Sequence, residues 1–214
     1  MWPRTKGDVL EMLRQYLRAG QMAVDVGAAC GKMTTVMLDQ VGPSGQVVTI
    51  EPDLTGRKAT TGVLRALGAT HQNLTVHECA VGEITGRVLL HRCGSTAASR
   101  WHGDGNAARE RLVPMVPLDR LVEQADLVKI DTQGSESHIL DGASQLLRHC
   151  PLWILELWPW GLQTAGRTVW DVLRQFREAN LTPCWPNGGP MVDADVDDWI
   201  ATSLDHHVNM LACR

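Results

Sequence analysis

Short apolar runs alternate with helix-length segments along almost the whole chain of 214 residues. In the first third, strands are predicted at 22–26, 47–51 and 74–78, with helices at 32–40 and 55–67 between them. Strands that alternate with helices favour a mostly parallel sheet, because each helix returns the chain to the same end of the sheet. This third is therefore predicted to be a βαβαβ unit, the mononucleotide-binding half of a doubly wound α/β fold.

Residues 92–110 interrupt the alternation. This polar, glycine-containing stretch is predicted to be a loop, flanked by short strands at 87–91 and 111–116. Long loops inside a compact domain are usually functional. We interpret this one as a candidate lid over a substrate.

The alternation resumes toward the C-terminus. Strands are predicted at 127–131 and 152–157, helices at 135–148 and 170–179, and two last strands at 182–185 and 207–213. No helix-length segment is evident between the last two strands, so the final strand is expected to be antiparallel. The fold class predicted for the chain is α/β, with a doubly wound and mostly parallel sheet.

The length, charge and cysteine content of the chain limit the number of domains and the classes of partner that it can have. The chain fits one domain, 1–214, with an opening helix within residues 1–20. A net charge of −4 argues against a strong nucleic-acid binder, whose surface is usually basic. No signal-peptide-like run occurs, nor a stretch of the roughly 20 apolar residues that a membrane span requires, so a cytoplasmic protein that does not bind membranes is predicted. Six cysteines without a C-x-x-C pair predict reduced thiols and no metal site.

The segment Asp25-Val26-Gly27-Ala28-Ala29-Cys30-Gly31 joins the first predicted strand to the first helix. Small residues at such a turn let a ligand approach the backbone and the helix amides. A dinucleotide fingerprint begun at Gly27 would need glycine where Ala29 and Lys32 stand. A Walker A loop ending at Lys32 would need Ser or Thr where Met33 stands. Both the pyrophosphate of a dinucleotide and a nucleoside triphosphate are therefore disfavoured.

Glu51 supplies the second half of the predicted nucleotide site. It follows Gly31 by twenty residues and ends the second strand, where its carboxylate can accept hydrogen bonds from both ribose hydroxyls. The alternative is structural: Glu51 then only caps the next turn, and the small loop residues only allow tight packing. The two motifs together favour a ribose-binding site.

A third segment is Lys129-Ile130-Asp131-Thr132-Gln133-Gly134-Ser135-Glu136, followed by Ile139-Leu140-Asp141-Gly142-Ala143 and Ile154-Leu155-Glu156. Together with the Asp25–Gly31 loop and Glu51-Pro52, this ordered set resembles the FkbM-type methyltransferase family over residues 20–160. The resemblance implies a Rossmann-like class I methyltransferase fold and S-adenosyl-L-methionine as the methyl donor. It also implies O-methylation of a hydroxyl group on a sugar or a natural-product intermediate.

The resemblance assigns the donor site residue by residue. The methionine end of the donor is placed beside Asp25, Gly27, Ala28 and Gly31, with Thr34 in the first helix and Asp131 at the end of a later strand. The ribose is placed at Glu51. The adenine is placed beside the backbone of Cys79 and Ala80. Ala29 departs from the asparagine that is usual in the family. A side-chain contact to the donor is therefore expected to be lacking at that position.

Methyl transfer from a sulfonium requires an aligned acceptor oxygen and an acceptor for the hydroxyl proton. Ligands of an open α/β sheet lie beyond the carboxyl ends of the strands, which makes Asp131 the first catalytic candidate. Glu156 lies at the matching depth of the next strand, and His138 follows Asp131 by seven residues, in the next predicted helix. Each has a structural alternative: His138 as a core histidine, and Glu156 as a partner that keeps Lys129 charged.

Tryptophan is unusually common in the last third of the sequence. Trp158-Pro159-Trp160 is expected at the same edge of the sheet, where flat rings could stack on a sugar or another planar acceptor. Core packing is the alternative. The predicted partner is thus a small-molecule acceptor, with carbohydrates as one candidate class, and not a nucleic acid.

Two other functions stay open at this point. A nucleotide-dependent oxidoreductase would share the βαβ start, and binding of NAD(P) without S-adenosylmethionine would favour it. A non-catalytic methyltransferase-like module would bind the donor without turnover. Turnover on a hydroxyl compound would decide for the methyltransferase.

Overall fold

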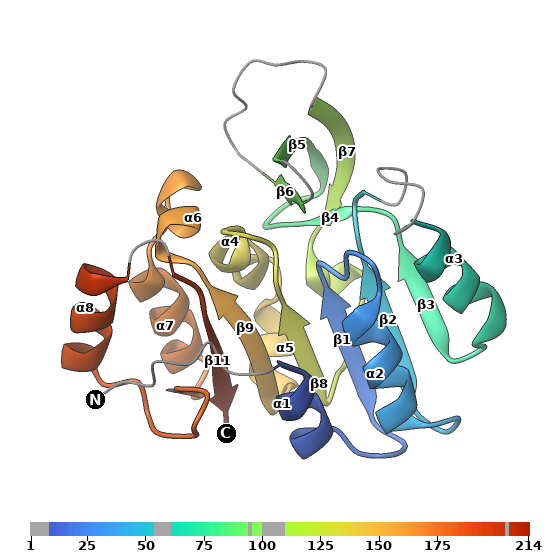
Figure 1. Cartoon of the computed structure of the whole chain (residues 1–214), viewed down its shortest axis with the longest axis horizontal. Helices are drawn as coiled ribbons and strands as arrows, with labels where there is room; N and C mark the ends of the chain where they lie inside the picture. Colours follow the sequence, from blue (N-terminus) through green and yellow to red (C-terminus); the bar gives the residue numbers. More distant parts are fainter. Residues whose placement is uncertain (1–8, 54–60, 94–95, 100–109, 204–205) are drawn as a thin grey trace.

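The structure is a computed structural model and describes residues 9–53, 61–93, 96–99, 110–203 and 206–214. A seven-stranded sheet has the order β10-β11-β9-β8-β1-β2-β3, and a four-stranded sheet has the order β4-β7-β5-β6. Figure 1 shows the smaller sheet beyond the carboxyl ends of the parallel strands β1, β8 and β9. The region between the two sheets is therefore the place to look for a ligand site.

The main sheet confirms the predicted fold class. Its strands are β1 (Met22–Val26), β2 (Gln46–Ile50), β3 (Leu74–His77), β8 (Leu127–Ile130), β9 (Leu152–Leu157), β10 (Thr182–Cys184) and β11 (Val208–Cys213). Strand β1 pairs in parallel with both β2 and β8, so the strand order reverses there. Strand β11 is antiparallel to both β9 and β10, as expected for the last strand. A reversal of strand order marks the crevice in which doubly wound folds bind ligands.

Helices cover both faces of the main sheet. Helices α1 (Val9–Tyr16), α2 (Lys32–Val41) and α3 (Thr61–Thr70) pack on one face, and α4 (Glu136–Asp141), α5 (Ser144–His149), α7 (Val169–Glu178) and α8 (Asp193–Thr202) on the other. In α7, Val169, Val172, Leu173 and Phe176 are buried, at the spacing of one helix face. A capping box between Thr168 and Asp171 fixes where this helix begins.

The predicted 92–110 loop contains a strand. Strand β6 (Thr96–Ser99) pairs antiparallel with the end of β5 (Gly86–Cys93), which in turn pairs with β7 (Glu110–Val116). The small sheet is completed by β4 (Ala80–Val81), and the 3-10 helix Leu118–Arg120 follows β7. The composition favoured a loop, but a neighbouring strand edge supplied partners for the 96–99 backbone. Residues 94–95 and 100–109, where much of the candidate lid would lie, are outside the described residues.

The helix predicted at 135–148 is two helices, α4 and α5. A Cβ at Gly142, between them, would lie 2.1 Å from the carbonyl oxygen of Gly82, so the chain there packs directly on backbone. Asp119 accepts hydrogen bonds from the backbone N–H groups of Gln145 and Leu146, at 2.8 and 3.1 Å. A tertiary contact and a cap from another segment therefore break a periodic apolar pattern that is continuous in the sequence.

Two further helices lie where none was predicted. Helix α6 (Pro159–Thr164) begins with proline at a position suited to a helix start, directly after Trp158. Helix α8 lies between the last two strands and buries only Val196 and Trp199. Its four aspartates hid the periodicity on which the prediction depended.

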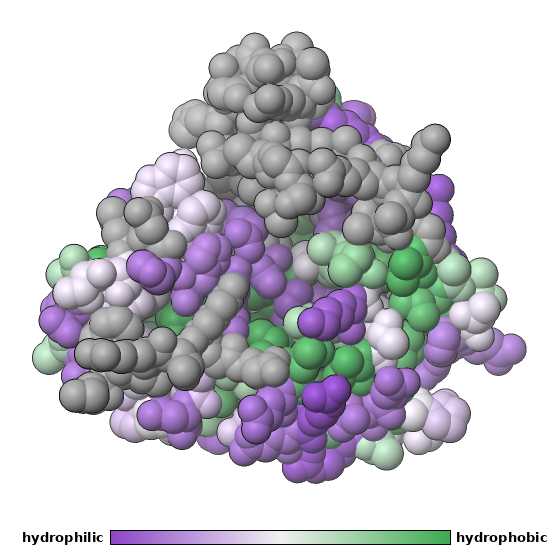
Figure 2. All heavy atoms as spheres, viewed as in Figure 1, coloured by the Kyte–Doolittle hydropathy of each residue, from purple (hydrophilic) through white to green (hydrophobic). Residues whose placement is uncertain are grey.

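The surface is consistent with the acidic, polar composition. Figure 2 shows hydrophilic residues along the lower rim of the molecule and hydrophobic residues in a smaller area toward α3. Among the described residues, no helix combines the length and apolar character that crossing a bilayer would demand.

Candidate functional site

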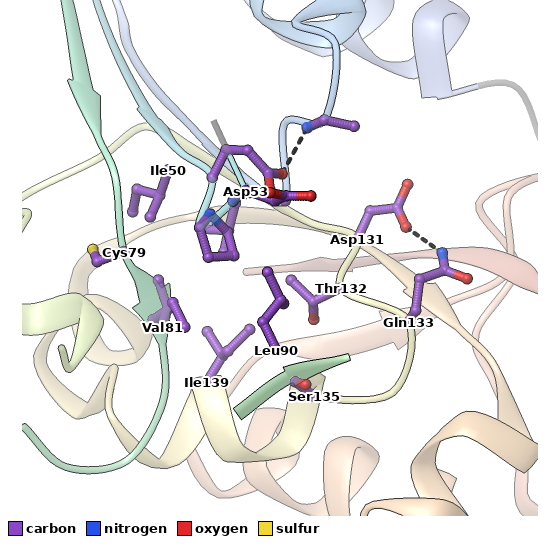
Figure 3. A pocket seen from close by; sticks show the side chains of 16 residues that line it. Ile50, Asp53, Cys79, Val81, Leu90, Asp131, Thr132, Gln133, Ser135 and Ile139 are labelled. Atoms are coloured by element: carbon purple, nitrogen blue, oxygen red, sulfur yellow. Dashed lines mark hydrogen bonds between the residues drawn. The ribbon is translucent and has the colours of Figure 1, made fainter. Parts of the chain in front are cut away.

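A cavity of about 190 Å³ opens at the carboxyl ends of β1, β2 and β8. Figure 3 shows Ile50, Cys79 and Val81 toward one end of it and Asp131 and Gln133 toward the other. Its lining comes from the glycine loop, the end of β2, β4, β5 and the segment after β8: Val26, Gly27, Ala29, Ile50, Glu51, Pro52, Asp53, Cys79, Ala80, Val81, Leu90, Asp131, Thr132, Gln133, Ser135 and Ile139. The cavity is thus apolar at one end and carries carboxylates at the other.

The glycine loop places bare backbone against this cavity. Gly27 has φ +75°, and a Cβ there would lie 2.0 Å from the carbonyl oxygen of Asp131. Gly31 has φ +79°, and its Cβ would meet Leu64 of α3 at 2.7 Å. Ala29 also adopts a positive φ, of 48°, a region in which asparagine is better tolerated than alanine. Both loop glycines are therefore required by conformation and by space.

Glu51 is held by the backbone on both sides. One carboxylate oxygen accepts the N–H of Ala29 at 2.9 Å, and the other accepts the N–H of Asp53 at 2.8 Å. Burial raises the pKa of Glu51, while the two backbone hydrogen bonds oppose that rise. A carboxylate oxygen has further acceptor capacity after one such bond, so Glu51 is fixed in place and can still receive ligand hydroxyls.

Asp25 lies behind the loop instead of in the cavity. Its carboxylate is fully buried, 2.9 Å from the ammonium of Lys129, and accepts a 2.7 Å hydrogen bond from the hydroxyl of Thr34. Lys129 also donates to the carbonyl oxygen of Gly27 at 3.1 Å. Of the residues expected to touch the donor, Asp25, Ala28, Gly31 and Thr34 do not line the cavity, whereas Gly27, Glu51, Cys79, Ala80 and Asp131 do. The buried residues Asp25, Thr34 and Lys129 therefore hold the glycine loop in position.

Charge balance explains how Lys129 can be buried. Burial alone would lower the pKa of its ammonium, but Asp25, Asp131 and Glu156 together raise that pKa. Asp131 shows the opposite balance: burial raises the pKa of its carboxyl, Lys129 lowers it, and Glu156 raises it further. Lys129 thus lies among three carboxylates: Glu156, which the sequence offered as its partner, Asp131 and Asp25.

Gln133 links the two candidate carboxylates. Its amide nitrogen donates to Asp131 at 2.9 Å and to Glu156 at 2.7 Å. Its backbone has φ +60°, and a Cβ on the next residue, Gly134, would overlap the backbone of Gly161 at 2.5 Å. No role was predicted for Gln133, although it stands inside the Lys129–Glu136 segment that carries part of the family resemblance.

Glu136 fixes the segment between β8 and α4. One carboxylate oxygen accepts the backbone N–H and the hydroxyl of Thr132, at 3.0 and 3.1 Å, and the N–H of Gly134 at 3.2 Å. The other oxygen is buried and has no hydrogen-bond partner among the described residues. Burial raises the pKa of Glu136 to about 7. The neutral acid is therefore the form that the fold favours.

The substitution Glu136→Gln should remove a pH dependence of stability. The folded-state pKa of Glu136 is about 7, above the ordinary glutamate value of 4.5. The neutral acid therefore stabilises the fold fully below pH 4.5, and this stabilisation is lost as pH rises through 7. From pH 5 to pH 8 the wild type should lose about 2 kcal/mol relative to Glu136→Gln. Urea unfolding at both pH values measures this difference. The exposed Glu123→Gln is the control, and equal pH slopes in wild type and Glu136→Gln would contradict the prediction.

His138, a predicted catalytic candidate, does not line the cavity. Its Nε2 lies 3.0 Å from the carbonyl oxygen of Ala165, and its Nδ1 lies 3.7 Å from Glu83. Glu83, His138 and Asp141 bring three possible metal ligands together, but the guanidinium of Arg167 sits 2.6 Å from Asp141 and 3.6 Å from Glu83. An arginine already supplies the positive charge at this cluster, and α4 directs His138 toward it.

Trp158 and Trp160 do lie at the carboxyl end of β9, as expected. The ring of Trp158 stacks on His207, with centroids 4.8 Å apart and planes at 12°, and lies 5.0 Å from the ring of Trp160. One face of Trp158 is therefore covered by protein. This contact limits its role as a platform for an acceptor.

A doubly wound sheet, a glycine loop at the strand-order reversal and a buried acidic residue at the end of β2 together define a Rossmann-like methyltransferase fold. A model of the Methyltransferase FkbM domain matches residues 25–180. The chain belongs to this family, as the sequence resemblance indicated.

Solved structures support the fold. The methyltransferase FkbM of Methylobacillus flagellatus KT is 19% identical with a TM-score of 0.58, covering 96% of this chain and 50% of its own. Aeropyrum pernix fibrillarin, crystallised with natively bound S-adenosyl-L-methionine, is 13% identical with a TM-score of 0.50, covering 95% of this chain and 72% of its own. A Triticum aestivum protein-L-isoaspartate O-methyltransferase is 41% identical over 49 residues, 23% of this chain and 21% of that protein. The chain thus spans half or less of two of these relatives.

Proposed function

We propose that the protein transfers the methyl group of S-adenosyl-L-methionine to a hydroxyl oxygen of a small molecule, such as a sugar or a natural-product intermediate. The observation that carries the proposal is Glu51, buried at the cavity edge and held by two backbone amides. A carboxylate fixed in this way at the end of the second strand suits the two hydroxyls of a ribose. Family membership supports methyl transfer as the reaction.

The cavity residues fit the chemical parts of this donor. Glu51 would hold the ribose, and the backbone at Cys79 and Ala80, beside apolar side chains, would flank the adenine. Gly27 and Asp131 would border the methionine end, where the missing Cβ leaves bare backbone. When bound, the donor supplies an activated methyl group on a sulfonium. The protein's own task is to orient both substrates and to exclude water.

Polar groups beyond Asp131 support oxygen as the acceptor atom. Gln133 and Glu156 extend the line of polar side chains away from the cavity along the carboxyl ends of β8 and β9. A hydroxyl acceptor needs hydrogen-bond partners and a group that takes its proton. The wheat O-methyltransferase that shares a 49-residue match is consistent with an oxygen acceptor.

Titration calorimetry with S-adenosylhomocysteine tests the donor site. We expect micromolar binding to the wild type and a loss of about 10-fold to 100-fold in Glu51→Gln, because the amide cannot accept from two backbone N–H groups and from ribose together. Glu78→Gln, an exposed carboxyl at the end of β3, is the control and should bind as the wild type does. A folded wild type that binds NAD(P) but not S-adenosylhomocysteine would overturn the proposal.

A further inference from the structure

His207 lies at the carboxyl end of β9 although it comes fifty residues later in the chain. Strand β11 runs antiparallel to β9 with Val208 opposite Leu157, so the preceding residue, His207, falls beside Trp158. Its Nδ1 is 2.9 Å from a carboxylate oxygen of Glu156. His207 Nδ1 forms no hydrogen bond with the described residues, so the two side chains are paired by proximity. The register of one strand pair thus creates a histidine–carboxylate pair.

This pair is connected to the cavity. The Glu156 oxygen that faces His207 also accepts the 2.7 Å hydrogen bond from Gln133, and Gln133 in turn donates to Asp131. Figure 3 shows Asp131 and Gln133 joined by this bond at one end of the cavity. A continuous polar path therefore leads from the cavity wall to the imidazole.

Two groups enclose His207 on the side of β9. Glu156 is 4% exposed, and one of its carboxylate oxygens faces Nδ1 of the imidazole. The ring of Trp158 lies parallel to the imidazole, with the ring centroids 4.8 Å apart. Other charged groups near the pair are Asp131 and Lys129, and Lys129 pairs with Asp25. Glu156 and Trp158 together therefore hold the imidazole ring in place.

His207 is also accessible. Its side chain is 24% exposed, whereas Glu156 is almost completely buried. Nδ1 faces Glu156, and Nε2 forms no hydrogen bond with another described residue. A buried carboxylate beside a partly exposed histidine resembles the arrangement of a general base with its supporting acid.

We propose that His207, placed by Glu156 and Trp158, is the general base for the hydroxyl of a small-molecule acceptor bound beyond Asp131 and Gln133. This rests on the proposed function. The acceptor oxygen forms its bond to the methyl carbon as the sulfur–carbon bond breaks, and the sulfur keeps that electron pair. Nε2 of His207 takes the hydroxyl proton and later releases it to water. Glu156 acts as a positioning residue.

The first test is NMR of the histidine side chains in wild type saturated with S-adenosylhomocysteine. Methyl glycosides of glucose, galactose, mannose and rhamnose are added in turn, and the His207 signal is assigned with His207→Gln. At least one glycoside should shift the His207 Cε1–H signal and leave that of its exposed neighbour His206 unchanged. If none of the four shifts His207, the inference is overturned.

The second test is turnover of the glycoside that binds. His207→Gln should lower kcat by about 100-fold or more with unchanged S-adenosylhomocysteine affinity, and His206→Gln should match the wild type. Glu156→Gln should lower kcat and leave the KM for the glycoside unchanged, a split that a merely structural role would not give. Full kcat in a folded His207→Gln would refute the base assignment while leaving methyl transfer intact. Failure of wild type to bind S-adenosylhomocysteine would instead refute the proposed function.

Discussion

The substitution Gly27→Ala should destabilise the protein by about 4 kcal/mol and weaken S-adenosylhomocysteine binding at least about 10-fold. Two costs combine at this position. An alanine at φ +75° is strained, and its Cβ would lie 2.0 Å from the carbonyl oxygen of Asp131. The ends of β1 and β8 would have to separate, although the N–H of Asp131 now donates to the carbonyl oxygen of Val26 at 3.1 Å. That separation would displace two walls of the cavity.

Gly166→Ala separates the two costs. Gly166 has nearly the same φ, +74°, but a Cβ there would meet nothing within 4 Å. This control variant should therefore lose only about 1 kcal/mol, the cost of the backbone conformation. Urea unfolding of both variants, with calorimetric titration of S-adenosylhomocysteine, gives the comparison. If Gly27→Ala were no less stable than Gly166→Ala, the close approach of the loop to Asp131 would be disproved.

The substitution Lys129→Met should cost about 3 to 5 kcal/mol of unfolding free energy. It leaves the fully buried carboxylate of Asp25 with the hydroxyl of Thr34 as its one side-chain hydrogen-bond donor among the described residues. It also removes the 3.1 Å hydrogen bond from the ammonium to the Gly27 carbonyl oxygen. The loss should therefore appear both as lower stability and as weaker donor binding.

A matched ion pair on the surface serves as the control for Lys129→Met. Arg174 and Asp171 are also 2.9 Å apart, but the arginine side chain is 59% exposed. Arg174→Met should cost less than about 1 kcal/mol, because water screens the pair and solvates the remaining carboxylate. The double variant Asp25→Asn/Lys129→Met should recover part of the stability, since no unpaired charge stays buried. Equal losses in Lys129→Met and Arg174→Met, measured by urea unfolding, would contradict this account.

The sequence determined the fold class and several residues that line the candidate site. Strand-length apolar runs between helical segments predict a parallel sheet, because period and length are local properties. Gly27 and Glu51 were also predictable, since both stand where a strand ends, and strand ends in a parallel sheet meet at one edge. The segment from Lys129 to Glu136 was identified as part of the family resemblance. The sequence did not show, however, that Gln133 joins two carboxylates.

The tertiary structure alone decided which predicted residues reach the cavity. Asp25 and Asp131 both follow from strand ends, yet Asp25 points to a buried lysine and Asp131 to the cavity. The break between α4 and α5 depends on Asp119 and on the backbone of Gly82, both distant in sequence. His207 meets Glu156 only through the register of β11 on β9. Local patterns specify the period of an element and where it ends, whereas the pairing of side chains from distant segments follows from packing and register, which no local pattern records.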